Sequence, residues 1–182
     1  MLKNRIENPF LRGLIEWMLA IGLAFLLFFA AREFVFRVAH VTGSSMEPTL
    51  NHGDMVVLNR LIYLFASPRA GDIVAFPYPE NPSEFYIKRV VGVPGDIIDL
   101  RNGEFIINGQ PLDDPFSGDP VLALGDVAFP VVVEEGRFFV LGDNRNGSKD
   151  SRFNAVGTVP GRDMVGRVAV RVWPFGALGQ VE

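Results

Sequence analysis

The chain opens with one long apolar stretch and then changes to short apolar runs broken by turn residues. Residues 17–31 carry no charge, and extension back through Glu16 to Leu14 gives eighteen residues. That length is at the lower edge of what crosses about 30 Å of hydrocarbon as a helix. The pattern therefore predicts a single transmembrane anchor over residues 13–31, preceded by a short segment, residues 1–12.

Two other interpretations of this stretch stay open: a cleaved signal peptide, and a buried or peripheral amphipathic helix. Cleavage requires small residues at positions −3 and −1, but Phe28 and Phe29 stand at −3 of the alanines that end the stretch. Three basic residues precede the stretch and two follow it. The positive-inside rule then favours a cytoplasmic N-terminus and a body outside the cytoplasm.

The body of the chain is predicted to be mostly β, an antiparallel β domain over residues 32–182. Short β-branched runs alternate there with Gly, Pro, Asn and Asp, and no long segment repeats with a helical period. The expected strands are residues 54–59, 72–76, 85–91, 97–100, 104–107, 138–141 and 164–173. The pairs Asn102-Gly103 and Asn108-Gly109 are typical of tight hairpin turns and predict a three-strand meander.

The last of these strands alternates, with Gly166 and Val168 on one face and Arg167 and Ala169 on the other, which predicts a half-buried strand. Residues 111–136 hold four prolines and four aspartates. We interpret them as an irregular excursion from the sheet, because proline and aspartate favour turns.

Composition and charge exclude several kinds of functional site and one kind of partner. Hydrophobic residues make up 48% of the 182 residues, and cysteine is absent, which excludes disulfides, thiolate metal sites and cysteine nucleophiles. Residues 1–39 hold five basic and three acidic residues, which leaves twelve basic and eighteen acidic ones in residues 40–182. Nucleic acid is not an expected partner, because neither part has the basic face that phosphate binding requires.

Three segments hold candidate chemistry, and the first is Gly43–Leu50. An ordinary polar turn is one interpretation, since Ser and Gly favour turns and Pro48 stops a helix. A serine in it becomes a nucleophile if a base lies within hydrogen-bond reach and backbone N–H groups face the developing oxyanion.

The second segment, Tyr86–Asp96, places Lys88 and Arg89 on opposite faces of a strand, so at least one cation lies among apolar neighbours. A desolvated lysine becomes a neutral base near pH 7, whereas arginine does not. Lys88 is therefore the usable base, unless it reaches out to solvent from an edge strand.

The third segment, Gly142–Arg152, is dense in short polar side chains and opposite charges, with Asp143 and Arg145, and Asp150 and Arg152, as natural pairs. It is either a surface loop held by its own hydrogen bonds or the support of a site. The two histidines, His40 and His52, match no metal-site spacing, and a dyad of Ser45 with His52 requires the chain to fold back within seven residues.

Taken in order after an N-terminal anchor, the three segments resemble the bacterial type I signal peptidases, membrane-bound Ser–Lys endopeptidases that remove signal peptides from exported preproteins. The resemblance implies that Ser45, directly before Met46, is the nucleophile and Lys88 the general base. It implies that Ser148 orients the Lys88 amine. The residues expected to hold that wall of the site are Asp143, Arg145, Asp150 and Arg152.

This chain departs from the best-known proteobacterial pattern at Gly43, where that pattern has a serine whose hydroxyl contributes to the oxyanion hole. The resemblance also implies shallow pockets for small residues at P1 and P3 of an Ala-X-Ala cleavage site, next to an extended substrate strand. The residues expected to line these pockets are Val41, Met46, Leu50, Tyr86 and Ile87. No metal or cofactor is expected.

The expected partners are the signal peptides of preproteins, the lipid bilayer and, nearby, the secretion translocase. The expected location is the plasma membrane, crossed once. Two competing functions are a Ser–Lys self-cleaving protease of the repressor type and a non-catalytic, membrane-anchored β-domain that binds partners. The anchor and the acidic body disfavour the first, since repressors of that type are cytosolic and bind DNA.

One further apolar run, Leu61–Ala66, lies between Arg60 and Arg69 and is too short to span a bilayer. Two interpretations stay open: a buried strand or hairpin, and a loop that enters the outer leaflet of the membrane.

Overall fold

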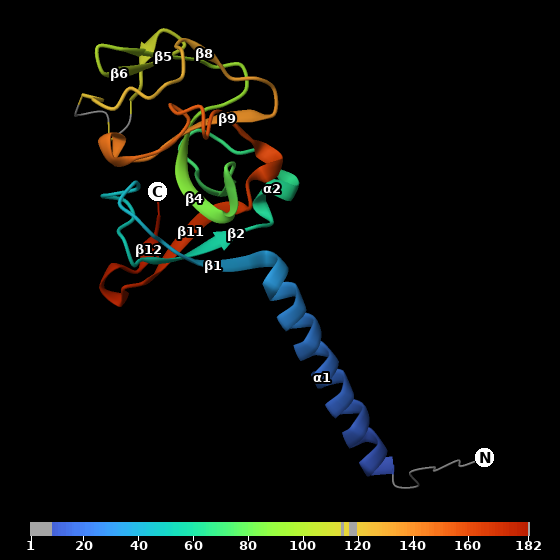
Figure 1. Ribbon diagram of the computed structural model, residues 1–182. Helices are drawn as coiled ribbons and strands as arrows, with labels where there is room; N and C mark the ends of the chain where they lie inside the picture. The colour runs from blue at the N-terminus through green and yellow to red at the C-terminus, as the bar shows by residue number, and fades with distance from the viewer. Residues whose placement is uncertain (1–8, 114, 117–119, 182) are drawn as a thin grey trace. The chain divides into compact units, whose positions relative to one another are not determined.

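The computed structural model describes residues 9–113, 115–116 and 120–181, and the chain forms two compact units, Met1–Val35 and Phe36–Glu182. The first unit contains the helix α1, Pro9–Val35 (Figure 1). Within it, Pro9–Phe29 is long and apolar enough to cross a membrane, and none of this window is buried in the protein. The helix extends past both ends of the expected span, 13–31, and most of the expected leading segment, residues 1–8, lies outside the described residues.

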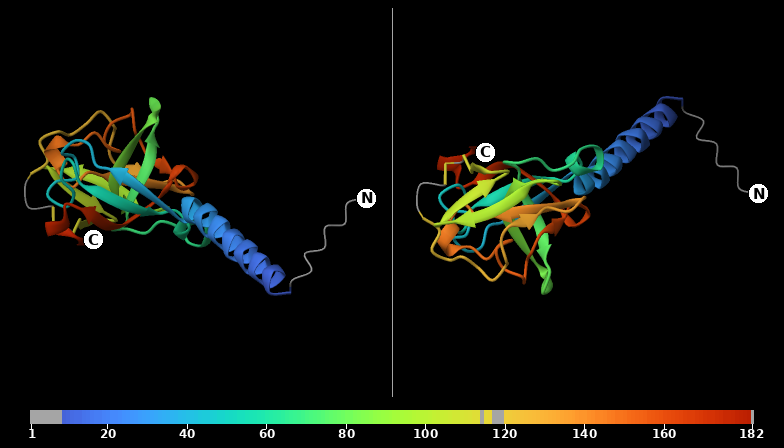
Figure 2. Two further views of the ribbon diagram at one scale, coloured as in Figure 1. Left: turned by 90° about the horizontal axis from the view of Figure 1, so that it is seen from below. Right: turned by 90° about the horizontal axis from the view of Figure 1, so that it is seen from above.

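The second unit is built from antiparallel strands, which confirms the mostly β fold class. Its main sheet runs in the order β1-β2-β11-β3-β4-β9-β10, with β12 paired to β11. The strands are β1 Phe36–His40, β2 Met55–Asn59, β3 Ile73–Tyr78, β4 Asn81–Gly92, β9 Arg137–Leu141, β10 Val159–Pro160, β11 Gly166–Trp173 and β12 Gly179–Gln180. Figure 2 shows the green hairpin of β3 and β4 projecting from this sheet.

A second, smaller sheet has the order β7-β6-β5-β8. Its strands are β5 Ile97–Arg101, β6 Glu104–Ile107, β7 Gln110–Pro111 and β8 Val131–Val132. The two predicted hairpin turns are confirmed: Asn102 and Asn108 have φ of 52°, and the glycines that follow them have φ of 80° and 83°. These positive φ values are what a two-residue hairpin turn requires.

Some elements were not predicted. Besides β1, β8, β10 and β12, they are the short helix α2, Ile62–Phe65, and the 3₁₀ turns η1 Arg145–Gly147, η2 Gly161–Asp163 and η3 Phe175–Ala177. Strand β11 is half-buried as predicted, but its strict alternation ends at the register shift after Val168. The excursion 111–136 is largely irregular as expected, although residues 114 and 117–119 lie outside the described residues.

The core has three parts, and the alternation of strand residues decides which part each side chain joins. On β3, Val74 and Phe76 pack into one cluster and Ile73 and Ala75 into another, so the main sheet is covered on both faces. The third cluster joins β4 and β9 to the small sheet through residues such as Phe139. Lys88 and Arg89 of β4 therefore start from a strand that is buried on both sides.

Candidate active site

The loop from Val41 to Asp54 carries Ser45 and is fixed at both ends. The Val41 N–H donates to the Asp54 carbonyl at 2.9 Å, and the Leu50 N–H donates to the Met46 carbonyl at 2.8 Å. Met46 and Leu50 are buried in the core, so the residue before Met46 is held at the surface of that core. The sequence of small polar and buried apolar residues thus presents Ser45 on a rigid turn.

Strand β4 brings Lys88 to this serine. The Lys88 ammonium donates to Ser45 Oγ at 2.7 Å and to the Ile87 carbonyl at 3.0 Å, although 43 residues separate Ser45 and Lys88 in the sequence. A nucleophile and a base within hydrogen-bond reach are the minimum geometry for covalent catalysis by a serine. The structure therefore brings together the two residues that the sequence singled out.

Burial makes Lys88 a usable base. Only 3% of the residue is exposed, and this desolvation lowers the pKa of Lys88 from 10.5 to about 8, while Asp150 and Asp143 act in the opposite direction. At pH 7 such a group is neutral in about one molecule in ten, against roughly one in 3,000 for an ordinary lysine. The site thus supplies a few hundred times more free amine than a surface lysine.

The loop 142–152 holds Ser45 from the other side. The Asn144 N–H donates to the Ser45 carbonyl at 3.1 Å, and the Asn144 amide nitrogen donates to the Ser44 carbonyl at 3.2 Å. A Cβ on Gly142 would stand 2.2 Å from Ser148 Oγ and 2.4 Å from the Ser45 carbonyl oxygen. Only glycine fits this close approach, so Gly142 and Asn144 join the site, neither of which the sequence analysis had singled out.

Buried ion pairs support this loop. The Arg152 guanidinium donates to both carboxylate oxygens of Asp150, each at 2.8 Å, and Asp150 in turn accepts from the Gly142 N–H at 3.0 Å. Asp150 and Arg152 are the pair that the sequence predicted. Both are fully buried, and the bidentate geometry is what makes such a pair tolerable away from water.

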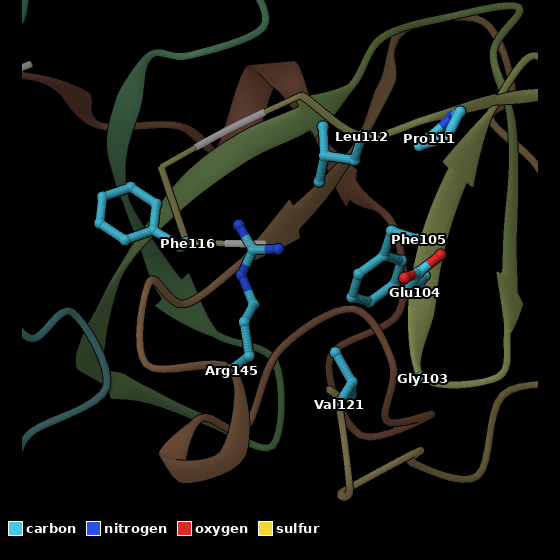
Figure 3. A pocket seen from close by; sticks show the side chains of 8 residues that line it. All are labelled: Gly103, Glu104, Phe105, Pro111, Leu112, Phe116, Val121 and Arg145. Atoms are coloured by element: carbon cyan, nitrogen blue, oxygen red, sulfur yellow. The ribbon is translucent and has the colours of Figure 1, made fainter. Parts of the chain in front are cut away.

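The other predicted pair, Asp143 with Arg145, is wrong. Asp143 follows β9 and accepts two hydrogen bonds, at 2.8 and 2.9 Å, from Arg89 on the neighbouring strand β4. Arg145 is the first residue of the turn η1, and its Nε donates to the Gly142 carbonyl at 3.1 Å. Figure 3 shows its guanidinium between Phe105 and Phe116, in a separate cavity of about 250 Å³.

Comparison with known proteins decides the family. The profile of the family described as signal peptidase, peptidase S26, matches residues 14–173. A signal peptidase I from Leptolyngbya laminosa is 39% identical over 176 residues, which cover 92% of this chain and 84% of that protein. The chain belongs to the S26 signal peptidase family. A signal peptidase IB from Staphylococcus aureus is 36% identical over 179 residues, which cover 90% of this chain and 92% of that protein.

A solved structure is also similar. The crystal structure of a signal peptidase I from Enterococcus faecalis is 30% identical, covers 57% of this chain and 98% of that chain, and gives a TM-score of 0.48. Membership of the S26 family makes this protein a serine peptidase that removes signal peptides. Its apolar N-terminal helix fits membrane anchoring.

A cleft of about 370 Å³ opens over the pair in this signal peptidase. Its lining includes four of the five expected substrate-binding residues, Val41, Met46, Tyr86 and Ile87. Leu50, the fifth, is completely buried in the core below and does not line the cleft. A second hollow lies between the unpredicted strand β1 and strand β4, and it shares His40, Phe85 and Ile87 with the cleft.

Ser148 belongs to the loop 142–152, and no hydrogen bond joins it to Lys88. Its residue is 6% exposed, and its Oγ is buried with no hydrogen-bond partner in the described part of the chain. Buried hydroxyls normally have a partner, so this one is unusual.

The histidines take other places. The Gly43 N–H donates to His52 Nδ1 at 3.2 Å, so His52 faces the start of the serine turn, while Ser45 Oγ is occupied by Lys88. Gly43 has a φ of 90°, a conformation that glycine adopts most readily. Within residues 9–113, 115–116 and 120–181, no group of three or more His, Cys, Asp or Glu side chains could hold a metal ion.

Proposed function

We propose that this signal peptidase cleaves preproteins through a Ser45–Lys88 dyad and an acyl-enzyme. The observation that carries the proposal is the 2.7 Å contact between Ser45 Oγ and the Nζ of a buried lysine. An exposed lysine at that distance would stay protonated at neutral pH. A buried one loses its proton readily enough to serve as a base.

The proposed reaction has two halves. The neutral Lys88 amine takes the proton of the Ser45 hydroxyl while Oγ attacks the carbonyl carbon of the P1 residue, which gives a tetrahedral oxyanion. The Lys88 ammonium then gives that proton to the leaving nitrogen of the mature chain, and an ester on Ser45 remains. Lys88 next takes a proton from water, whose hydroxide attacks the ester carbonyl carbon. As the ester bond breaks, the Lys88 ammonium returns this proton to Ser45 Oγ, and the signal peptide leaves with its new carboxylate.

The oxyanion requires donors. The Ser45 N–H has no acceptor within the described part of the chain, so it is free to donate to the substrate oxygen. Gly43 brings no side-chain donor, and its own N–H is engaged with His52. Loss of one such donor costs about 2.7–4 kcal/mol in other serine peptidases. We therefore assign the Ser45 N–H as the principal donor.

The substrate is proposed to lie extended in the cleft between β1 and β4, with main-chain hydrogen bonds to a strand edge. The apolar lining by Val41, Met46, Tyr86 and Ile87 suits small apolar side chains at P1 and P3, as in Ala-X-Ala. Ser148 is proposed to orient the Lys88 amine when it is neutral. The wall behind it is proposed to be held by Asp143, Asp150 and Arg152, and by Arg145 through its bond to the Gly142 carbonyl.

The first prediction tests the dyad. We expect Ser45→Ala and Lys88→Ala each to abolish cleavage of a preprotein whose signal peptide ends in Ala-X-Ala, measured by gel shift with the full chain in detergent. Ser44→Ala is the matched control, since Ser44 is adjacent, exposed and not bonded to Lys88. Turnover that survives in Lys88→Ala would contradict the dyad.

The location proposed is the plasma membrane, with the N-terminus in the cytoplasm and the catalytic domain outside, near the secretion translocase. The three-to-two excess of basic residues before the anchor supports this orientation. The run Leu61–Ala66 is a candidate for contact between the catalytic domain and the membrane. It is not a buried strand but forms α2, where Leu64 is 70% and Phe65 is 86% exposed.

We propose that α2 rests in the outer leaflet. Tyr63 is turned inward and donates to Asp72 at 3.1 Å, which leaves Leu64 and Phe65 as the apolar surface. Phe36, the first residue after α1, pairs with Asn59, three residues before α2 begins. The unit that contains α2 therefore begins, at Phe36, beside the strand that leads into α2, and the flanking arginines suit anionic headgroups.

The second prediction tests this contact. Because the chain has no cysteine, Phe65→Cys can be labelled with a fluorescent probe in the full chain reconstituted into vesicles. We expect lipid-attached quenchers to quench it and aqueous iodide to leave it largely untouched. Val132→Cys, exposed on the small sheet, is the matched control and should respond to iodide. Equal iodide quenching at both positions would overturn the proposal.

A further inference from the structure

A second lysine lines the same cleft as Lys88. The ammonium of Lys149 donates to the hydroxyl of Tyr78, and that hydroxyl donates to the carboxylate of Glu80. Lys149 Nζ also lies 3.4 Å from Glu80 Oε2. The three side chains form one closed set of hydrogen bonds at the rim of the active site.

These three residues join two separate parts of the site. Tyr78 ends β3 and Glu80 lies in the turn before β4, the strand that carries Lys88. Lys149 belongs to the loop 142–152 and stands directly between Ser148 and Asp150. The hydrogen bonds therefore connect the hairpin that carries the base to the loop 142–152.

The tyrosine extends this connection to Lys88. The rings of Tyr78 and Tyr86 are stacked, with centroids 4.5 Å apart and planes within 5° of parallel. Lys88 Nζ lies 5.0 Å from the centroid of the Tyr86 ring. The two rings thus form a wall between Lys88 and the hairpin side of the cleft, and the Tyr78 hydroxyl determines where that wall stands.

Lys149 itself is not a second base. Its hydrogen bond to Tyr78 raises the pKa of Lys149, with Glu80 acting in the same direction. It stays an ammonium at the pH where Lys88 loses its proton. The cleft thus contains one desolvated lysine that reacts and one charged lysine that remains a tether.

We propose that Lys149 is a positioning residue. Its bond to Tyr78 holds the stacked rings of Tyr78 and Tyr86 against Lys88, and the rings keep water away from the amine. The structural claim stands on the contacts alone. Its effect on cleavage rests on the proposed Ser45–Lys88 dyad.

The consequence concerns the protonation of Lys88. The groups that face Lys88 are Ser45, the Tyr86 ring and the carboxylates of Asp143 and Asp150, and both carboxylates favour the ammonium. Burial away from water opposes them and is the larger influence on the pKa of Lys88. If the wall opens, water reaches the amine and the pKa of Lys88 rises toward its ordinary value.

A titration by nuclear magnetic resonance tests the proposal directly. The chain has three lysines, Lys3, Lys88 and Lys149, so full-length protein labelled at lysine Cε gives three assignable signals in micelles. We expect the Lys88 midpoint near pH 8 in the wild type and about one pH unit higher in Lys149→Met and Tyr78→Phe. Lys149→Arg keeps a donor and a charge, and should return most of the shift.

Cleavage measured over pH 6–10.5 gives the second readout. We expect Lys149→Met to lower kcat/KM about tenfold at pH 7, with little change in KM, and to recover near pH 10, where Lys88 is neutral in both proteins. Arg162→Met changes an exposed cation of η2 that does not line the cleft, so this control should match the wild type at every pH.

Each result decides one question. An unmoved Lys88 midpoint in Lys149→Met overturns the positioning role, whether or not cleavage is detected. A loss of the same size at every pH also overturns it, because that indicates general damage to the fold. A wild type that fails to cleave contradicts the proposed dyad, while the titration still tests the wall.

Discussion

Lys88 and Arg89 are neighbours on β4, and both are buried, with 3% and 7% of the residue exposed. They point to opposite faces of the strand, and their hydrogen-bond partners differ in charge. Arg89 donates two hydrogen bonds to the carboxylate of Asp143. Within the described part of the chain, Lys88 donates only to a hydroxyl and a backbone carbonyl. The strand thus carries one neutralised cation and one cation without a carboxylate in contact.

The difference separates structure from reactivity. A guanidinium cannot lose its proton in a protein, so a buried arginine needs a carboxylate, and its planar fork matches one. An ammonium without such a partner relieves its desolvation by losing its proton. The Arg89 side of β4 therefore stabilises the fold. On the Lys88 side, burial of the ammonium destabilises the folded state and lowers the pKa of the lysine.

The largest effect is expected from a substitution that disrupts the ion pair of Arg89 with Asp143. Asp143→Ala removes the carboxylate that accepts two hydrogen bonds from the buried Arg89, and removal of one partner of a buried pair costs about 3–5 kcal/mol. We expect that loss in the free energy of unfolding, measured by urea titration of the full chain in micelles.

The matched control for this change is Glu134→Ala, an exposed carboxylate, which should cost no more than about 0.5 kcal/mol. A loss below about 1 kcal/mol for Asp143→Ala would mean that Arg89 is not held by this pair, and would remove the contrast with Lys88.

The next effect has the opposite sign and concerns Lys88. The fall of its pKa from 10.5 to about 8 corresponds to a penalty on the folded state of about 3 kcal/mol below pH 8. Lys88→Met removes the charge at similar volume. We expect this variant to lack activity and to be at least as stable as the wild type at pH 7.

The pH dependence of that difference is a sharper test. Between pH 8 and 10.5 the unfolded wild type binds more protons than the folded wild type, so its stability rises with pH. The advantage of Lys88→Met should therefore shrink over this range. An advantage that is constant with pH, or a variant several kcal/mol weaker at pH 7, would show that burial of Lys88 carries no such penalty.

The sequence predicted what depends on local pattern. Alternating β-branched runs and the two Asn-Gly turns placed β5 and β6 to within a residue, because pleat and turn geometry act over a few positions. The contact of Ser45 with Lys88 was expected from the order of the motifs and not from their spacing. No local rule joins residues 43 positions apart.

Long-range pairing is where prediction failed. Asp143 stands two residues from Arg145, which suggested a pair, but the turn η1 carries Arg145 to another cavity and the sheet brings Arg89 instead. Strand β1 was not predicted, because it directly follows the apolar anchor in the sequence. The run that became α2 is too short for periodicity to distinguish helix from strand.

The smallest expected effect completes the series with an exposed pair on the small sheet. Arg101 Nε lies 2.6 Å from a carboxylate oxygen of Asp99, closer than the atoms of the Arg89 pair, but the Arg101 side chain is 71% exposed. Water and salt screen such a pair, so Arg101→Ala should change the free energy of unfolding by no more than about 0.5 kcal/mol in the same urea titration. A cost above about 1 kcal/mol would mean that distance, and not burial, sets the worth of an ion pair in this protein, and the contrast between Arg89 and Lys88 would then need another cause.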